Sequence, residues 1–275
     1  ILQLYHVPGI LPVPRMRQRV DHARRRGIGI FLFFDARQKK MKIVGQHEKR
    51  PCFRAPARAF VVVQLIDGVE IHGANHYLIQ QFFSKLSNLR TDKWGGSLNK
   101  RMAFPLAVVK EVKAIVDEYA PKGFIIGYRI SPEELHGKNV GYDYTEALTL
   151  ISEVIKYELD YIHLSLWAGY NSKPENSEKS YAELFKEILD DKTKLLIVGG
   201  IFGEDTATDA IENYADLIAV ARGTLIDPNF AKKVTEGKGD TILHKISPET
   251  VEYSHLTPGL LEAFSREDSL GLLPL

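Results

Sequence analysis

The chain has 275 residues, of which 44% are hydrophobic and 26% charged, a balance typical of a soluble globular protein. No stretch approaches the roughly 18 to 20 consecutive apolar residues of a membrane helix, and the first residues lack the basic and apolar regions of a signal peptide. The single cysteine, Cys52, excludes an internal disulfide framework and favours a cytoplasmic location.

Charge is distributed unevenly along the chain. Residues 1–60 carry 14 Lys and Arg against 3 Asp and Glu, which leaves 22 basic and 32 acidic residues for the remainder. A basic segment of this kind is compatible with binding to nucleic acid or another anionic surface. No nucleic-acid-binding motif accompanies it, so we do not expect nucleic acid as a partner.

From residue 67 onward, short apolar runs alternate with helical stretches. The predicted strands are Asp67–His72, Phe124–Ile130, Asp160–Ser165, Leu195–Gly199 and Leu217–Ala221. The predicted helices are Lys100–Glu118, Asp143–Glu158, Ser180–Leu189 and Glu204–Glu212. Repeated strand and helix units predict an α/β protein with a parallel sheet. At this length a single TIM (β/α)8 barrel domain over residues 1–275 is favoured over an open doubly wound sheet.

Three further apolar runs bear on whether such a barrel closes. Ile1–His6 predicts a sixth strand. Ile28–Phe34 and Phe60–Leu65 would complete the set of eight, but they lie in the basic region, where the helical spacing found downstream is absent. Residues 7–66 are therefore atypical of the predicted domain.

Polar side chains follow the first of the downstream strands. His72 and Asn75 are hydrogen-bonding residues three positions apart, and the phenol of Tyr77 comes two residues later. In a barrel, residues at the carboxyl ends of strands form the active site. Such a pair can stabilise charge that develops on a carbonyl oxygen, and a phenol can donate a proton. The alternative is a core histidine and a packing tyrosine.

An arginine and two glycine sites occur at other strand ends. Arg129 ends an apolar strand, where a buried cation requires an anion or an electron-rich ring; a structural salt bridge is the alternative. Gly199-Gly200 and Arg222-Gly223 close two consecutive strands, with Asp227-Pro228 predicted to open a helix. Glycines at such positions typically bind phosphate through backbone N–H groups.

Two segments resemble a known family. His72–Leu78, and the stretch Asn88–Arg101 with its Trp94-Gly95-Gly96-Ser97 core, look like the signature of the Old Yellow Enzyme family of NADH:flavin oxidoreductases. The segment Gln3–His6 resembles that family's third strand. The resemblance runs from about residue 67 to the C-terminus. Asn88–Arg101 itself is interpreted as scaffold, with Ser97 as the N-cap of the following helix.

The resemblance implies roles for the residues at the strand ends. FMN would be held by Gln3, Arg129, Gly199, Gly200, Arg222 and Gly223. His72 and Asn75 would bind the substrate carbonyl or the nicotinamide carboxamide, and Tyr77 would protonate the substrate α-carbon. We assign no role to His136 or His163, and no metal site is predicted.

The implied function is an FMN-dependent oxidoreductase, in which hydride passes from NADH or NADPH through the flavin to the C=C of an α,β-unsaturated carbonyl compound. A homo-oligomer is left open. The family's first two strand–helix units are missing from this chain, so the rival is a non-catalytic, flavin-free barrel fragment that keeps a phosphate site. Trp167 and Tyr170 either line the site or pack beside it.

Residues 7–66 admit three interpretations. The first is a sequence that is not native-like, such as a shifted reading frame. The second is an insertion that binds an anionic partner through Arg24-Arg25-Arg26 and Lys39-Lys40. The third is a solvated loop.

Overall fold

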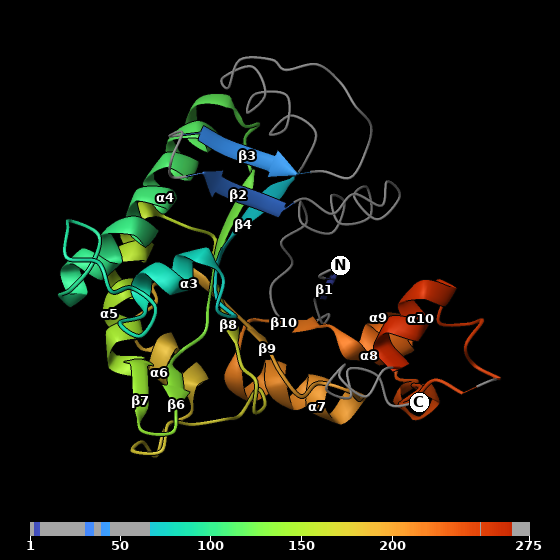
Figure 1. The fold of residues 1–275 in the computed structure, drawn as a ribbon. Coiled ribbons are helices and arrows are strands. Elements are labelled where there is room, and N and C mark those ends of the chain that lie inside the picture. The colour runs from blue at the N-terminus through green and yellow to red at the C-terminus, as the bar shows by residue number, and fades with distance from the viewer. Residues whose placement is uncertain (1–2, 6–30, 36–39, 45–66, 248, 266–275) are drawn as a thin grey trace. The chain divides into compact units, whose positions relative to one another are not determined.

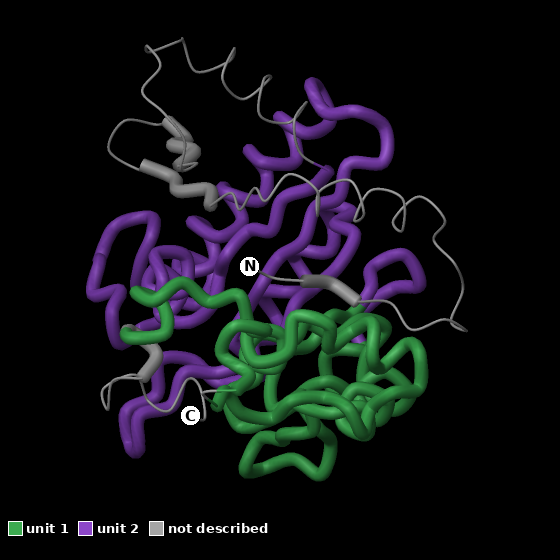
Figure 2. Tube along the Cα trace, turned by 90° about the vertical axis from the view of Figure 1, so that its right-hand side faces the viewer, with its two compact units in different colours: residues 1–11, 166–187, 195–275 green, residues 12–165, 188–194 purple. Residues whose placement is uncertain are grey.

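The computed structural model describes residues 3–5, 31–35, 40–44, 67–247 and 249–265. These residues divide between two compact units, which Figure 2 distinguishes by colour. Unit 1 comprises residues 1–11, 166–187 and 195–275, and unit 2 comprises 12–165 and 188–194. The single domain over residues 1–275 stays a prediction, and each unit is described by itself. Within the described part of the chain, no helix combines the length and apolar character needed to span a membrane.

Unit 2 contains a parallel three-stranded arrangement, with β5 between β4 and β8. Its strands are β2 (Phe31–Asp35), β3 (Lys40–Val44), β4 (Gly68–Gly73), β5 (Ile125–Ile130), β6 (Glu134–His136), β7 (Asn139–Tyr142) and β8 (Tyr161–Ser165). Its helices are α3 (Leu78–Phe83), α4 (Leu98–Tyr119), α5 (Tyr144–Val154) and the 3-10 turn η1 (Ile155–Tyr157). Figure 1 shows α3, α4 and α5 grouped beside these strands.

The register of the three strands sorts their side chains into rows. His72 pairs with Arg129, and Arg129 pairs with His163. Because side chains alternate across a strand, these residues lie on one face and their neighbours on the other. Tyr128 and Ile162, from the opposite face, are fully buried. The hydrophobic core of unit 2 thus lies on one side of the strands, and the polar row lies on the other.

Helix α5 follows from its sequence. Asp143 caps it by accepting a hydrogen bond from the backbone N–H of Glu146 at 2.9 Å, which satisfies a donor that the first turn leaves unpaired. Its buried face consists of Ala147, Leu150, Ile151 and Val154. The 3.6-residue spacing of the sequence predicts a face of Ala147, Leu148, Ile151 and Ile155, and the observed face is rotated from it by a fraction of a turn.

Unit 1 contains two parallel strands, β9 and β10, with β1 antiparallel to β10. The strands are β1 (Gln3–Tyr5), β9 (Lys194–Val198, of which 195–198 belong to this unit) and β10 (Leu217–Val220). The helices are α6 (Tyr181–Lys186), α7 (Glu204–Asp209), the π-helical turn η2 (Ala210–Tyr214), α8 (Arg222–Ile226), α9 (Phe230–Thr235), the 3-10 turn η3 (Gly239–Thr241) and α10 (Pro258–Ser265).

The five strands predicted downstream of residue 67 are confirmed to within one residue at each end. The four predicted helices are confirmed in position, but their lengths differ from those predicted. Two predicted barrel strands differ. The run Ile28–Phe34 overlaps β2, which pairs antiparallel with β3 in a separate two-stranded sheet. β1 pairs antiparallel with β10, not parallel as a barrel strand would. An antiparallel strand at the edge of a sheet needs only backbone hydrogen bonds to its neighbour and no crossover helix. Phe60–Leu65 lies outside the described residues.

Two local expectations concern the starts of helices. The helix expected at Asp227-Pro228 begins at Phe230, because the Asp227 carboxylate is occupied in a buried turn, where it accepts from the backbone N–H groups of Asn229 and Leu243 at 3.0 Å each. The prediction that Ser97 is the N-cap of α4 is confirmed in position, although its side chain makes no capping hydrogen bond.

Candidate active site

The polar row of unit 2 brings the predicted residues of that unit together. The rings of His72 and Tyr77 have centroids 5.0 Å apart and meet edge to face. The Arg129 guanidinium donates through Nη2 to the Ser165 hydroxyl at 3.0 Å, and Ser165 lies 2.8 Å from the Asn75 Oδ1 atom. One hydroxyl therefore connects the predicted flavin-binding arginine to the predicted substrate-binding asparagine.

The direction of these hydrogen bonds fixes the orientation of the Asn75 amide. Arginine has only donors, so the Ser165 oxygen accepts from Arg129 and its proton is free to point at Asn75. The amide then presents its oxygen to Ser165, which leaves its NH2 group available as a donor. Asn75 is exposed, so this donor is accessible to a ligand.

His72 presents a second donor. Its Nδ1 atom accepts a hydrogen bond from the backbone N–H of Ala74 at 3.2 Å, and a nitrogen that accepts carries no proton. In the neutral ring the proton is therefore on Nε2. Burial, reinforced by the positive charge of Arg129, lowers the pKa of His72 below its ordinary value of 6.5, which favours the neutral ring.

The segment that carries Asn75 and Tyr77 has an unusual backbone. Asn75 and His76 both lie in the left-handed region, with φ of 56° and 60°, which costs energy for non-glycine residues. The backbone N–H of Asn75 donates to the Ser131 hydroxyl at 3.0 Å, which holds the turn against the end of β5. The turn brings Tyr77 to the surface, where 59% of the residue is exposed.

Arg129 is a half-buried cation without an ion pair among the described residues. No carboxylate of the described residues lies within ion-pair distance of it, and its Nε atom is buried without a hydrogen-bond partner in the same set. Burial lowers the pKa of the guanidinium. The structural salt bridge considered as the alternative is thus not found within the described chain. A buried unsatisfied N–H costs about 1 to 3 kcal/mol, so this side chain fits a site for an electron-rich ligand.

A second polar cluster, missed by the sequence reasoning, connects His163 of this row to Glu70 and Tyr161 of the next row on the same face. The Glu70 carboxylate accepts from the Tyr161 hydroxyl at 3.0 Å and lies 2.8 Å from Nδ1 of the fully buried His163. Burial raises the pKa of Glu70, but the hydrogen bond and charge of His163 outweigh it and leave that pKa lowered. Gly127 makes the cluster possible, because a Cβ there would lie 2.1 Å from the Tyr161 ring.

The interpretation of Asn88–Arg101 as scaffold agrees with its contacts. The Asn88 amide donates to the backbone oxygens of Phe82 and Trp94 at 2.6 and 2.7 Å. The buried Arg101 donates to the backbone oxygen of Phe83 and to Glu146, each at 2.5 Å. These bonds tie the loop to α3 and α5.

Unit 1 carries the predicted glycine sites. Gly199 and Gly200, directly after β9, have φ of 149° and 65°, and a Cβ on Gly199 would lie 2.1 Å from the Leu166 backbone oxygen. Gly223 lies inside α8 rather than in a loop, and a Cβ there would lie 3.3 Å from the Ile201 oxygen. The two glycine sites are thus neighbours with room for backbone but not for side chains, which fits a phosphate site.

Four other residues of unit 1 bear on the predicted site. The Arg222 guanidinium lies 4.7 Å from the centre of the Phe202 ring, and in the described part of the chain no carboxylate forms an ion pair with it. Trp167 is 87% exposed, whereas Tyr170 is buried and donates to Asp209 at 2.6 Å. Tyr170 therefore packs. The backbone of Gln3 pairs with that of Val220 in the β1–β10 ladder.

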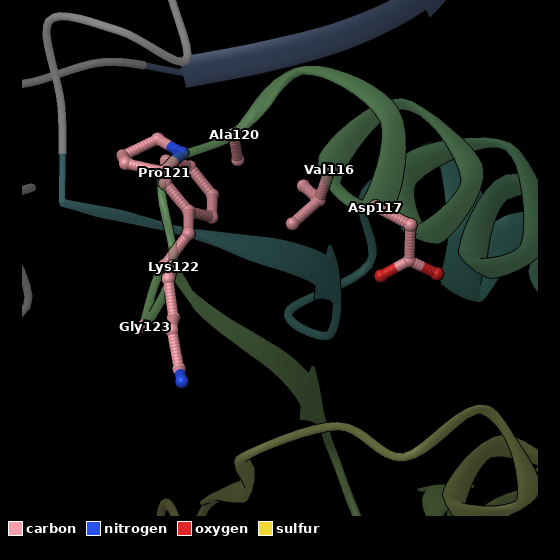
Figure 3. A pocket seen from close by; sticks show the side chains of 7 residues that line it. Val116, Asp117, Ala120, Pro121, Lys122 and Gly123 are labelled. Atoms are coloured by element: carbon pink, nitrogen blue, oxygen red, sulfur yellow. The ribbon is translucent and has the colours of Figure 1, made fainter.

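Unit 2 also contains a hollow of about 210 Å³, at the opposite end of β5 from the polar row (Figure 3). It is lined by the end of α4 and the loop that leads into β5: Val116, Asp117, Ala120, Pro121, Lys122, Gly123 and Phe124. This is the amino end of β5, whereas the polar row lies toward its carboxyl end. Since α/β enzymes carry their chemistry at the carboxyl ends of strands, we assign the hollow no role in catalysis.

Comparison with known proteins identifies the family of the chain. Parallel strands with polar side chains and glycines at their carboxyl ends are typical of α/β enzymes. The profile of the NADH:flavin oxidoreductase / NADH oxidase family matches residues 53–241, and the chain belongs to this family. The match begins at residue 53, earlier than the expected residue 67.

Among its relatives, the probable NADH-dependent flavin oxidoreductase YqiG of Bacillus subtilis is 45% identical over 200 residues, which are 72% of this chain and 53% of that protein. The NADH:acrylate oxidoreductase of Vibrio harveyi is 41% identical over 61% of this chain and 17% of its own length. The chain thus spans about half of the first relative and less of the second.

Two solved structures have a similar fold. Histamine dehydrogenase from Rhizobium sp. 4-9 matches with a TM-score of 0.54 and 25% identity, over 68% of this chain and 27% of its own. Morphinone reductase matches with a TM-score of 0.53 and 23% identity, over 84% of this chain and 64% of its own. The expected Old Yellow Enzyme-like fold is supported by these neighbours; a barrel that lacks two units is not tested by them.

Proposed function

We propose that this chain belongs to an FMN-dependent oxidoreductase that uses NADH or NADPH to reduce the C=C bond of α,β-unsaturated carbonyl compounds. The observation that carries the proposal is the pair of donors that the hydrogen bonds of the site leave unused, His72 Nε2–H and the Asn75 amide NH2, with the Tyr77 ring in contact with the His72 ring. Two donors aimed at one oxygen polarise a conjugated carbonyl and stabilise the charge that develops on it.

The cofactor sites follow the same proposal. The half-buried guanidinium of Arg129, which has no ion pair among the described residues, would lie against the polar edge of the flavin ring, and Gly199, Gly200, Arg222 and Gly223 would hold the phosphate, with Gln3 as a further contact to the ring. When bound, FMN supplies the hydride that it has received from the nicotinamide.

The protein's own contribution is orientation and proton transfer. His72 and Asn75 bind the carbonyl oxygen, which draws electron density from the β-carbon. Tyr77, exposed and in contact with the His72 ring, donates its proton to the α-carbon as the hydride arrives at the β-carbon. The two carbons thereby gain one hydride and one proton, which completes a two-electron reduction.

The substrate class draws support from the relatives' names. The Vibrio harveyi relative is named for acrylate, and a Klebsiella pneumoniae relative, 36% identical over 74% of this chain and 23% of its own length, is named an NADH:fumarate oxidoreductase. Both compounds carry a C=C bond conjugated to a carboxyl group. We further propose that the described strands belong to a (β/α)8 barrel without its first two units in this chain.

A visible absorption spectrum tests the proposal. We expect added FMN to bind, to bleach under anaerobic NADH, and to recover its colour when an enone or acrylate is added. Bleaching without recovery would remove the proposed substrate class. Failure to bind FMN at high concentration would favour the rival, a flavin-free fragment with an inherited phosphate site.

A further inference from the structure

A group of metal-ligating side chains lies beside the donor pair but is not used by it. His76, Glu134 and His136 each offer one ligand atom, and these atoms lie within 4.8 Å of one another. His76 Nδ1 is 3.9 Å from one oxygen of Glu134, and His136 Nε2 is 3.6 Å from the other. The residues come from two places, the turn after β4 and the strand β6, both in unit 2.

The Glu134 carboxylate is buried and held in place. Gln80 Nε2 donates to its Oε2 atom at 2.9 Å, and the Ser84 hydroxyl donates to its Oε1 atom at 3.0 Å. Gly141 leaves room for it, since a Cβ there would lie 2.7 Å from the carboxylate carbon. Donors that orient a carboxylate from behind are the usual second layer of a metal site.

The charge at this position is not balanced by a permanent cation. Within the described residues, no Lys or Arg nitrogen lies within ion-pair distance of Glu134, and its possible cationic partners are His76 and His136. A buried carboxylate is costly unless it is paired or binds a metal. A divalent cation would supply the missing charge, with two imidazoles and one carboxylate as its ligands.

We propose that His76, Glu134 and His136 bind a divalent cation of the zinc class. Tetrahedral zinc with ligands at 2.0 to 2.2 Å places the ligand atoms roughly 3.3 to 3.6 Å apart. His136 Nε2 lies 3.6 Å from Glu134 Oε1, within this range, and His76 Nδ1 lies 3.9 Å from the other oxygen, Oε2, so that a small movement of the His76 side chain completes the set. The side chains of His76 and His136 are 62% and 53% exposed, so a fourth ligand position is open to water.

The proposed site has a consequence for the turn that it includes. His76 stands between Asn75 and Tyr77 and shares the left-handed backbone of Asn75. A bound cation would connect this turn to the β6–β7 hairpin and restrict its motion. The inference does not depend on flavin chemistry, because none of the three ligands belongs to the donor pair, and zinc binding is measured without a flavin or substrate.

Zinc titration of the full chain tests the proposal. The protein is freed of metal with a chelator and titrated calorimetrically with Zn²⁺ at neutral pH, as are the variants His76→Ala and His136→Ala. His244→Ala is the matched control, because His244 is exposed and outside the cluster. The parent and the control are expected to bind one zinc ion each. Either cluster variant should bind zinc with an affinity more than about 10- to 100-fold lower, because losing a direct ligand costs more than losing a residue that only orients a ligand.

Two further measurements separate the site from weak zinc binding elsewhere on the chain. Ser84→Ala, which removes one donor to Glu134, should weaken zinc binding by about 10- to 100-fold. Zinc should raise the melting temperature of the parent and of His244→Ala, but not that of the two cluster variants. Equal zinc stoichiometry and affinity in the parent, His76→Ala and His136→Ala would overturn the proposal, as would a loss confined to only one of these two variants.

Discussion

The Arg129→Met substitution should separate flavin binding from folding. Methionine keeps much of the side-chain length but removes the charge. In the flavin-free protein, the substitution removes the hydrogen bond to Ser165, and it also removes the cost of burying Nε, which has no partner among the described residues. The two effects oppose each other.

Their magnitudes are comparable. A hydrogen bond from a charged donor contributes about 1.5 to 3 kcal/mol, and a buried unsatisfied N–H costs about 1 to 3 kcal/mol. We therefore expect the free energy of unfolding of the flavin-free protein to change by no more than about 1 kcal/mol. With FMN, the variant loses a charge-assisted contact of about 1.5 to 3 kcal/mol, which raises the dissociation constant about 10- to 150-fold.

Urea unfolding and an FMN fluorescence titration measure the two quantities separately. Arg90→Met is the control, since Arg90 forms a surface ion pair with Asp92 and its loss should change stability by less than about 0.5 kcal/mol and leave FMN affinity unchanged. The reasoning is refuted if Arg129→Met destabilises the protein by 3 kcal/mol or more while FMN binds as tightly as before, because Arg129 would then be a structural residue.

Further predictions concern the same strands and loops. Gly127→Ala places a Cβ 2.1 Å from the Tyr161 ring and should cost about 1 to 3 kcal/mol in urea unfolding; no loss would contradict the described packing. Gly199→Ala should weaken FMN binding, because its φ is 149° and its Cβ meets a backbone oxygen; an unchanged titration would remove this loop from the phosphate site. NMR should find His72 protonated at Nε2 and titrating below pH 6.5. Because its folded pKa is lowered, its contribution to stability is complete above pH 6.5 and declines as the pH falls toward the folded pKa. Tyr77→Phe should slow alkene reduction more than flavin reduction by NADH, and equal slowing in stopped-flow traces would argue against a proton donor.

Much of the fold was predictable because strand and helix periodicity is a local property. The apolar runs that form β4, β5, β8, β9 and β10 were identified within one residue at each end. Pairing direction is not local, and for this reason β1 was expected in a parallel sheet although it pairs antiparallel with β10. The β6–β7 hairpin was missed because its strands, of three and four residues, are too short for a period to be seen.

The candidate site likewise contains residues that the sequence predicts and residues that only the folded chain reveals. His72, Asn75 and Tyr77 could be predicted because they follow one strand in sequence. Ser165 could not, because its role depends on the register that brings β8 beside β5.

Glu70 had a usable signal, since it lies two residues before His72 and a strand places alternate residues on one face. The grouping of His76 with Glu134 and His136 had no such signal, because the residues are about sixty positions apart and meet only in the folded chain.

The Ser165 hydroxyl determines which end of the Asn75 amide is presented to a ligand, and the shape of the turn alone does not. An aspartate at position 75 would have nearly the same size as Asn75 and would still accept from Ser165. Its outward oxygen, however, would repel a carbonyl oxygen and attract a hydroxyl or an ammonium group. The direction of one proton thus decides which functional group this turn can receive, and a substitution that preserves every contact distance would still invert the preference.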